Sequence, residues 1–248
     1  MKPTNFKYLI FLFTILFFFN SCKKDSETGK LNGLSDAKFN PGLSYGQVQD
    51  IDGNVYKTIQ IGDQIWMAEN LRTIHYRNGD PIKNVENSDS WITLTTGAYC
   101  NYENTFDKNE IATRGRLYNW YAVSDSRKIA PSGWHVPTDE DWKILVGNLG
   151  GDSVAGGKMK EEGTFHWNSE NVGANNESGF TALPSGYRDQ YYGSFSGINY
   201  NAFWWTSTED SETHSWYRYL NNQLTSVGRF SWDVGNKKSG FSVRCVKD

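Results

Sequence analysis

Aromatic rings interleaved with small polar side chains are the residues of this sequence best suited to bind a ligand, and they concentrate in residues 185–202. This segment contains four Tyr, three Ser, three Gly and two Asn. Tyrosine supplies rigid contact area with a polar tip, while Ser, Gly and Asn adapt their hydrogen bonds, and binding surfaces favour this mixture. The segment therefore predicts a long ligand-binding loop. The alternative is a solvated loop whose tyrosines cover the core.

The candidate binding residues extend from this segment into the aromatic region that follows it. Tryptophans there would continue a platform suited to the apolar faces of sugar rings. The candidate ligand-binding residues are Tyr187, Arg188, Tyr191, Tyr192, Tyr200, Trp205, Trp216 and Trp232. Five other tryptophans are expected in the core, namely Trp66, Trp120, Trp134, Trp142 and Trp204.

Local sequence motifs for catalysis or metal binding are absent. The sequence contains no G-x-S-x-G, no P-loop, no G-x-G-x-x-G and no H-E-x-x-H. The four histidines, at positions 75, 135, 166 and 214, stand too far apart along the chain to form a local metal pair. A carboxylate pair for glycoside hydrolysis can come from distant parts of a chain, but no such pair stands out. We therefore assign no catalytic residue, no metal site and no cofactor.

The charge balance argues against a nucleic-acid partner. The 248 residues carry 25 Lys plus Arg against 28 Asp plus Glu, a formal net charge of -3. Binding to phosphates needs an excess of basic residues gathered on one face. Aromatic residues make up 15% of the chain, so a folded core or a partner must cover them.

The N-terminal residues read as an export signal that ends at a cysteine. Residues 1–21 carry two lysines before an apolar run that is too short to span a bilayer. The sequence FNSC at residues 19–22 resembles a relaxed bacterial lipobox, which predicts lipidation of Cys22. This resemblance implies a lipid anchor at the outer membrane. The charged residues that follow Cys22 look like the signal that sends lipoproteins of Gram-negative, Bacteroidota-type bacteria to the cell surface. The alternative is an ordinary signal peptide with a chance cysteine.

Composition divides the rest of the chain into a tether and one domain. Residues 22–47 are rich in Lys, Ser, Gly, Asn and Asp, which predicts an acylated cysteine followed by a flexible tether. Residues 48–248 contain no linker and no repeat, so they are expected to form a single domain. In an exported chain the default expectation for Cys100 and Cys245 is a disulfide, and the alternatives are two buried thiols or a catalytic cysteine.

The clearest local elements are a hairpin and a helix. Alternating apolar residues flank the Asp52-Gly53 turn in residues 48–62, which predicts a β-hairpin. A helix is predicted over 138–149, with Thr138 as N-cap, Asp141 three residues later and Gly150 after its end. A shorter helix over 116–123 and strands over 203–207, 216–220 and 241–246 complete the prediction.

Several motifs together resemble the Fibrobacter succinogenes major paralogous domain, a family of exported bacterial proteins. They are DIDGNVYKTIQIGDQIWMAENL (50–71), GRLYNWYAV (115–123), APSGWHVPTDEDW (130–142), NNESGFTALPSGYR (175–188), FWWTSTE (203–209) and GFSVRCVKD (240–248). HVPTDEDW and GFSVRCV are also similar, more weakly, to segments of formylglycine-generating enzymes. That likeness implies an α+β, C-type-lectin-like fold, in which an early strand pairs with the terminal strand and the Trp142 helix packs on the sheet.

These observations favour a surface lipoprotein that binds glycans or a protein ligand, or that serves in adhesion. Two other functions stay open at this point. One is an enzyme on the formylglycine-generating scaffold, although its oxidase site is not recognisable in this sequence. The other is a structural surface protein without a small ligand.

Overall fold

The described part of the chain in this computed structural model comprises Met1 and residues 33–248. Apart from Met1, the predicted signal peptide (1–21) lies outside the described residues, and so does Cys22. Among the described residues, no helix is both long and apolar enough to cross a bilayer.

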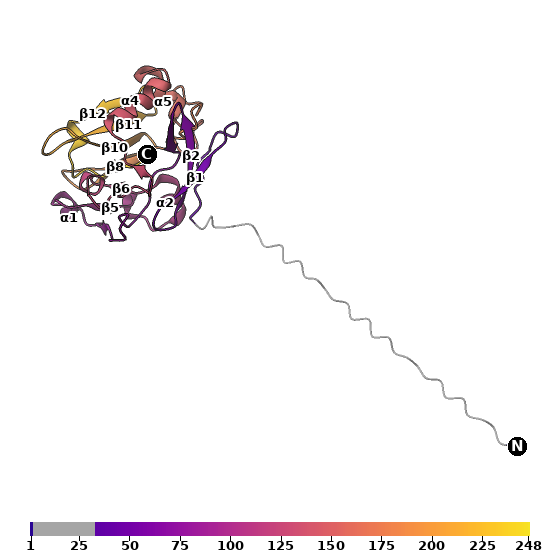
Figure 1. The fold of residues 1–248 in the computed structure, drawn as a ribbon, viewed down its shortest axis with the longest axis horizontal. Helices are drawn as coiled ribbons and strands as arrows, with labels where there is room; N and C mark the ends of the chain where they lie inside the picture. The colour runs from indigo at the N-terminus through magenta and orange to yellow at the C-terminus, as the bar shows by residue number, and fades with distance from the viewer. Residues whose placement is uncertain (2–32) are drawn as a thin grey trace. The chain divides into compact units, whose positions relative to one another are not determined.

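The first sheet joins the start of the domain to its end. Its strand order is β1-β2-β3-β13-β7. The bounds are Gly46–Gln49 for β1, Val55–Ile61 for β2, Gln64–Met67 for β3, Trp134–His135 for β7 and Val246–Lys247 for β13. The β1–β2 hairpin was predicted, and its turn contains Gly53 at a φ of 81°, a conformation that favours glycine. Figure 1 shows this hairpin at one side of the domain.

The terminal segment pairs with an early strand, as the resemblance implies. Val246 lies opposite both Trp66 and His135 in antiparallel pairs. Of the strand predicted over 241–246, only Val246 lies in a regular strand, but the backbone carbonyls before it still accept hydrogen bonds from the first sheet and the residues after it. The amides of Met67 and Leu71 donate to the carbonyls of Cys245 and Val243.

The second sheet has the strand order β12-β11-β10-β8-β9. The bounds are Ser185–Arg188 for β8, Phe195–Ile198 for β9, Asn201–Glu209 for β10, Ser215–Asn221 for β11 and Gly228–Phe230 for β12. The predictions of strands over 203–207 and 216–220 are confirmed. The prediction of a long loop over 185–202 is wrong, because β8 and β9 form an antiparallel hairpin in which Tyr187 lies opposite Ser196.

A third, small sheet and several short helices complete the fold. The strand order of this sheet is β4-β5-β6. The bounds are Lys83–Asn84 for β4, Ala98–Cys100 for β5 and Leu117–Tyr118 for β6. The short helices are α1 (Ser88–Ile92), α2 (Lys108–Arg114) and α3 (Trp120–Val123), with 3-10 turns at Tyr102–Asn104 and Asp233–Gly235. The helix predicted over 116–123 is therefore wrong in its first half, because Leu117–Tyr118 is strand β6, and confirmed only for α3. Asn119 caps α3 by accepting a hydrogen bond from the amide of Ala122.

The two longer helices are α4 (Asp139–Asn148) and α5 (Asp152–Met159). Thr138 caps α4 as predicted, and its side chain and that of Asp141 form a reciprocal capping box. Trp142 projects from α4 into the core, where its ring centroid lies 5.1 Å from that of Trp66 and 5.9 Å from that of Trp204. The predicted packing of this helix on the sheet is therefore confirmed.

Residues expected to form the end of the tether belong to the folded domain. Phe39, Leu43 and Tyr45 pack against the core cluster that contains Trp142. The Asp36 carboxylate accepts hydrogen bonds from the Thr113 hydroxyl at 2.8 Å and lies 2.9 Å from a ring nitrogen of His166. The tether prediction for residues 22–47 is thus wrong for this part, because apolar and charged contacts hold it on the domain. Residues 22–32 of the predicted tether lie outside the described residues.

The expected disulfide is not formed. Cys100 and Cys245 are both free and completely buried, and they lie in two different core clusters. Burial raises the pKa of the Cys100 thiol to about 12, so it stays protonated and unreactive at neutral pH. The cysteines therefore act as small apolar residues of the core.

The core is built largely from aromatic rings. All five tryptophans predicted to be core residues are buried, and Trp91 and Trp167 are buried with them. The described residues thus form an α+β fold, as predicted, with small sheets and helices packed around an aromatic core.

Candidate functional site

An aromatic hollow of about 310 Å³ lies on one face of the second sheet. Six of its lining residues are aromatic, namely Tyr187, Phe203, Tyr217, Tyr219, Phe230 and Trp232. The remaining lining residues are Ser196, Asn201, Asp233 and Val234. Its size is at the lower end of the range found for small-molecule sites.

Strand register explains why these rings gather. Successive side chains of a strand point to opposite faces, so alternate residues share a face. Phe203 of β10 lies opposite Tyr219 of β11, and Tyr217 lies opposite Phe230 of β12. These positions therefore present their rings to the same side of the sheet, and Tyr187 of β8 joins them there.

The floor of the hollow is a rigid aromatic layer. The Phe203 ring lies 4.9 Å from the Tyr187 ring and 5.0 Å from the Tyr219 ring, measured between centroids. Beneath them, Phe203 stacks on Phe241 at 5.0 Å. At the rim, Trp232 meets the edge of Phe230 at 5.7 Å and keeps 66% of its surface exposed. An exposed tryptophan beside a packed aromatic floor offers a stacking surface that is already in place before a ligand binds.

Polar groups border the aromatic floor. The Tyr219 hydroxyl donates to Asn201 Oδ1 at 3.0 Å and accepts from Asn221 Nδ2 at 3.0 Å. The Tyr217 hydroxyl makes no hydrogen bond to any other described residue. The Asp233 carboxylate is exposed at the rim. The hollow therefore combines ring faces with a fixed amide oxygen, a carboxylate and a free hydroxyl.

The tyrosine hydroxyls of the hollow stay neutral over the physiological range. Burial raises the pKa of Tyr187, Tyr217 and Tyr219, and the Asp233 carboxylate adds to this effect at Tyr217. A neutral phenol can both donate and accept a hydrogen bond. The hollow can therefore form hydrogen bonds with the hydroxyl groups of an uncharged, polyhydroxylated ligand.

A comparison with protein families decides which group the chain belongs to. The model of the Fibrobacter succinogenes major domain family matches residues 59–247. The chain belongs to this family. The match confirms the resemblance indicated by the sequence motifs. No curated protein and no solved structure matches the chain.

In this Fibrobacter succinogenes major domain, two of the predicted binding residues line the hollow, Tyr187 and Trp232. Two others are corrected, because Arg188 and Trp205 have no exposed surface. The Arg188 guanidinium donates to the carbonyls of Gly193, Val85 and Glu86 and is structural. Trp205 donates its indole N–H to the carbonyl of Tyr118 at 2.9 Å in the core.

The other four predicted residues lie outside the lining of the hollow. Trp216 projects to the opposite face of the sheet, because its neighbour Tyr217 faces the hollow, and the Arg229 guanidinium lies 3.6 Å from its ring centroid. Tyr191, Tyr192 and Tyr200 are exposed, at 65%, 79% and 52%. Asp189 fixes the turn that carries the first two by accepting from both of their amides.

Sequence reasoning missed most of the hollow in this domain. The residues not predicted are Ser196, Asn201, Phe203, Tyr217, Tyr219, Phe230, Asp233 and Val234. Several of these residues could have been predicted from one sequence pattern, the alternation of residues 201, 203 and 205 and of residues 217 and 219. That signal needs the strand pairing before it can be interpreted.

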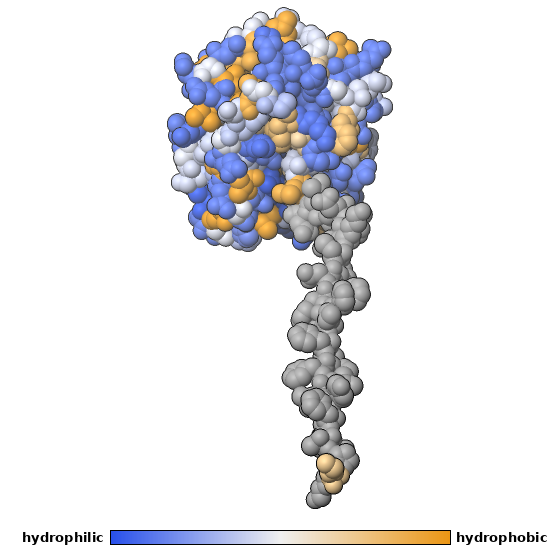
Figure 2. Space-filling model, turned by 90° about the vertical axis from the view of Figure 1, so that its right-hand side faces the viewer, coloured by the Kyte–Doolittle hydropathy of each residue, from blue (hydrophilic) through white to orange (hydrophobic). Residues whose placement is uncertain are grey.

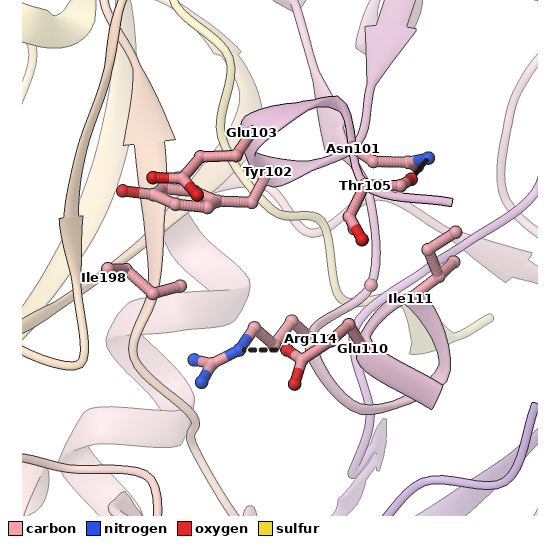
Figure 3. Close-up of a pocket in the computed structure, with 9 residues that line it drawn as sticks. Asn101, Tyr102, Glu103, Thr105, Glu110, Ile111, Arg114 and Ile198 are labelled. Carbon is pink, nitrogen blue, oxygen red and sulfur yellow. Dashed lines mark hydrogen bonds and ion pairs between the residues drawn. The ribbon is translucent and has the colours of Figure 1, made fainter. Parts of the chain in front are cut away.

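A second hollow, between the 3-10 turn at Tyr102–Asn104 (η1) and α2, is lined by Glu103 and Glu110, but its charged groups have a structural role. Figure 3 shows Arg114 paired with Glu110, the two side chains lying 2.9 Å apart, below Tyr102 and Glu103. Arg114 also donates to the Pro184 carbonyl and to Asn199 Oδ1, so it ties α2 to the segments around β8 and β9. The arrangement stabilises the local fold and leaves no free cation to face a substrate.

The rest of the surface offers weaker candidates. On the face drawn in Figure 2, hydrophobic residues are scattered among hydrophilic ones rather than gathered in one area. Within residues 33–248, no group of three or more His, Cys, Asp or Glu side chains is placed to hold a metal ion. The aromatic hollow is therefore the best candidate for a functional site.

Proposed function

We propose that this domain binds glycans at the cell surface, with the aromatic hollow as its saccharide site. The observation that carries the proposal is the exposed Trp232 ring next to a packed aromatic floor and a polar rim. Sugar rings have apolar faces that stack on aromatic side chains and hydroxyls that need fixed donors and acceptors. Asn201, Asp233 and the Tyr217 hydroxyl supply such partners at the border.

A C-type-lectin-like arrangement of the chain is part of this proposal. The insertion of β13 beside β3, and the packing of Trp142 of α4 on Trp66 of β3, support it. Membership of the Fibrobacter succinogenes major domain family fits a surface protein of this type.

A glycan array probed with wild type and Trp232→Ala tests the saccharide site. Stacking on one aromatic ring contributes about 1 kcal/mol, so the variant should lose about fivefold or more in affinity for its preferred glycan. Because Trp232 is exposed, its removal should leave folding intact. Tyr219→Phe, which removes the hydroxyl that bridges Asn201 and Asn221, should weaken the same glycans.

The matched control is Tyr192→Ala, which removes an aromatic ring that is even more exposed but lies outside the hollow. Its glycan profile should equal that of wild type. An array without signal for wild type, or equal losses in Trp232→Ala and Tyr192→Ala, would contradict the proposal.

We also propose that a lipid on Cys22 holds the domain at the outer membrane. Several acyl chains at about 0.8 kcal/mol for each buried methylene are sufficient for stable anchoring. Cys22→Ser should release the protein from the membrane fraction, and fractionation of cells that express each form measures this. Unchanged retention of the variant would contradict the anchor.

A further inference from the structure

A third hollow lies on the face of the second sheet opposite the aromatic hollow, and three of its lining residues are basic. It measures about 320 Å³ and is lined by Trp142, Lys143, Val146, Asp152, Arg218 and Arg229. We call it the basic pocket. Arg218 of β11 and Arg229 of β12 lie opposite each other in the register, so they share the face that Tyr217 and Tyr219 do not occupy.

Three cations of the basic pocket compete for one buried carboxylate. Asp139 Oδ1 lies 2.8 Å from an Arg218 nitrogen, and its Oδ2 lies 2.9 Å from Arg229 and 3.3 Å from Lys143. Lys143 also pairs with the exposed Glu140 at 3.1 Å. One carboxylate cannot satisfy two guanidinium groups and an ammonium, so hydrogen-bond donors remain available.

Two buried donors of the pocket have no partner among the described residues. They are Nη1 of Arg218, a side chain only 2% exposed, and Nε1 of Trp142, a side chain with no exposed surface. An unsatisfied buried donor is costly, and more so when it is charged. Both residues line the same hollow, but their two donor atoms have almost no accessible surface, so a ligand in the hollow meets the partly exposed Arg229 and Lys143.

The pocket also holds an unengaged acceptor. Asp152 lines it and is exposed, and its carboxylate forms no hydrogen bond or ion pair with any other described residue. Sulfate has no hydroxyl to donate to this carboxylate. A ligand with both an anionic group and hydroxyls would place the first at Arg229 and Lys143 and donate from a hydroxyl to Asp152.

We propose that the basic pocket is a second binding site, which takes the carboxylate of an acidic saccharide such as a uronic acid. Arg229 and Lys143 bind the carboxylate, the buried Trp142 and Arg218 line the site beside them, and Asp152 accepts a hydrogen bond from a sugar hydroxyl. The volume is sufficient for one sugar residue. The site is separate from the aromatic hollow and shares none of its lining residues.

Nuclear magnetic resonance of the indole N–H groups tests this site directly. The full chain, isotope-labelled at its tryptophan nitrogens, is titrated with glucuronate, glucose and inorganic sulfate. Glucuronate should move the Trp142 signal, which Trp142→Phe identifies by its loss. Glucose and sulfate should leave it unmoved at the same concentrations. The Trp232 signal reports the aromatic hollow, so failure of one site is distinguishable from failure of the other.

Lys143→Gln keeps the test independent of folding, because this side chain is 51% exposed. Arg229→Gln also removes a partner of Asp139, so its binding is compared only after urea unfolding shows that the variant is folded. Arg229→Gln and Lys143→Gln should each weaken glucuronate binding, by about tenfold for the arginine that faces the anion. Lys158→Gln is the matched control, because this lysine pairs with Glu177 outside the pocket. The proposal is overturned if glucuronate leaves the Trp142 signal in place, or if Lys158→Gln weakens binding as much as Lys143→Gln. It is also overturned if sulfate binds as well as glucuronate, because that result would indicate an adventitious ion only.

Discussion

Replacement of Asp139 by asparagine should destabilise the fold strongly at neutral pH and weakly in acid. Asp139 begins α4, and its carboxylate is the common partner of Arg218, Arg229 and Lys143. The asparagine side chain has the same shape but no charge. The change therefore removes the ionic interactions with little effect on packing.

The magnitude follows from the pKa of the carboxyl. Burial by itself raises the pKa of Asp139, but hydrogen bonds from Arg229 and Arg218 outweigh burial and lower it from 3.8 to about 2. The side chain is only 8% exposed, so solvent screens it little. A pKa lowered to this extent on folding contributes about 2 kcal/mol. Because the folded-state pKa is the lower one, this stability is present above about pH 4 and is lost as the pH falls towards 2.

Urea unfolding followed by tryptophan fluorescence measures the effect. At neutral pH the free energy of unfolding should fall by at least about 2 kcal/mol in Asp139→Asn, since Arg218 is left without its carboxylate. At about pH 2.5 the difference from wild type should shrink to about 1 kcal/mol or less. Glu140→Gln, on the next and exposed residue, should change stability by under about 0.5 kcal/mol. A loss of the same size at both pH values would refute the reasoning.

The remaining predictions concern the cysteines and the N-terminal segment. In Cys22→Ser without reductant, Cys100 and Cys245 should give two reactive thiols after unfolding and none in the native protein, because both are buried; the absence of thiols after unfolding would show a disulfide. Asp36→Ala should loosen the segment around Lys38, since Asp36 loses its contacts with Thr113 and His166. Trypsin should then cleave after Lys38 faster than in wild type, as read by mass spectrometry of the fragments, whereas Asp63→Ala should leave the rate unchanged. Equal cleavage rates in Asp36→Ala and wild type would contradict the role of Asp36.

Elements with local signals were predictable from the sequence. Thr138 and Asp141 mark the start of α4 within three residues of each other, and the turn at Gly53 sits between alternating apolar residues. The pairing of the terminal strand with an early strand was predicted from the likeness to formylglycine-generating enzymes rather than from a local pattern, and the structure shows β13 paired with β3. Nothing near Val246 in the sequence indicates that its partner is Trp66.

The candidate site was harder to predict because its parts meet only through strand register. Trp205 and Trp216 were predicted to belong to one platform. Trp205 lies opposite Tyr217, so these two side chains share a face of the sheet, and Trp216, the residue before Tyr217, points to the other face. The composition of residues 185–202 is typical of both a binding loop and an edge hairpin. Tyr187, predicted as a binding residue, lines the hollow, whereas Arg188, its neighbour, faces inward and is buried among backbone carbonyls.

The alternation of β11 has a consequence for how this domain can diverge. Tyr217 and Tyr219 serve the aromatic hollow, and Arg218 between them serves the basic pocket. A point substitution in this strand alters one surface and leaves the other unchanged, so duplicated copies of the gene can change the two surfaces separately. Insertion or deletion of a single residue would instead exchange the faces, placing arginine among the rings and tyrosine against Asp139. Paralogues are thus expected to differ in the side chains of β11 but not in its length.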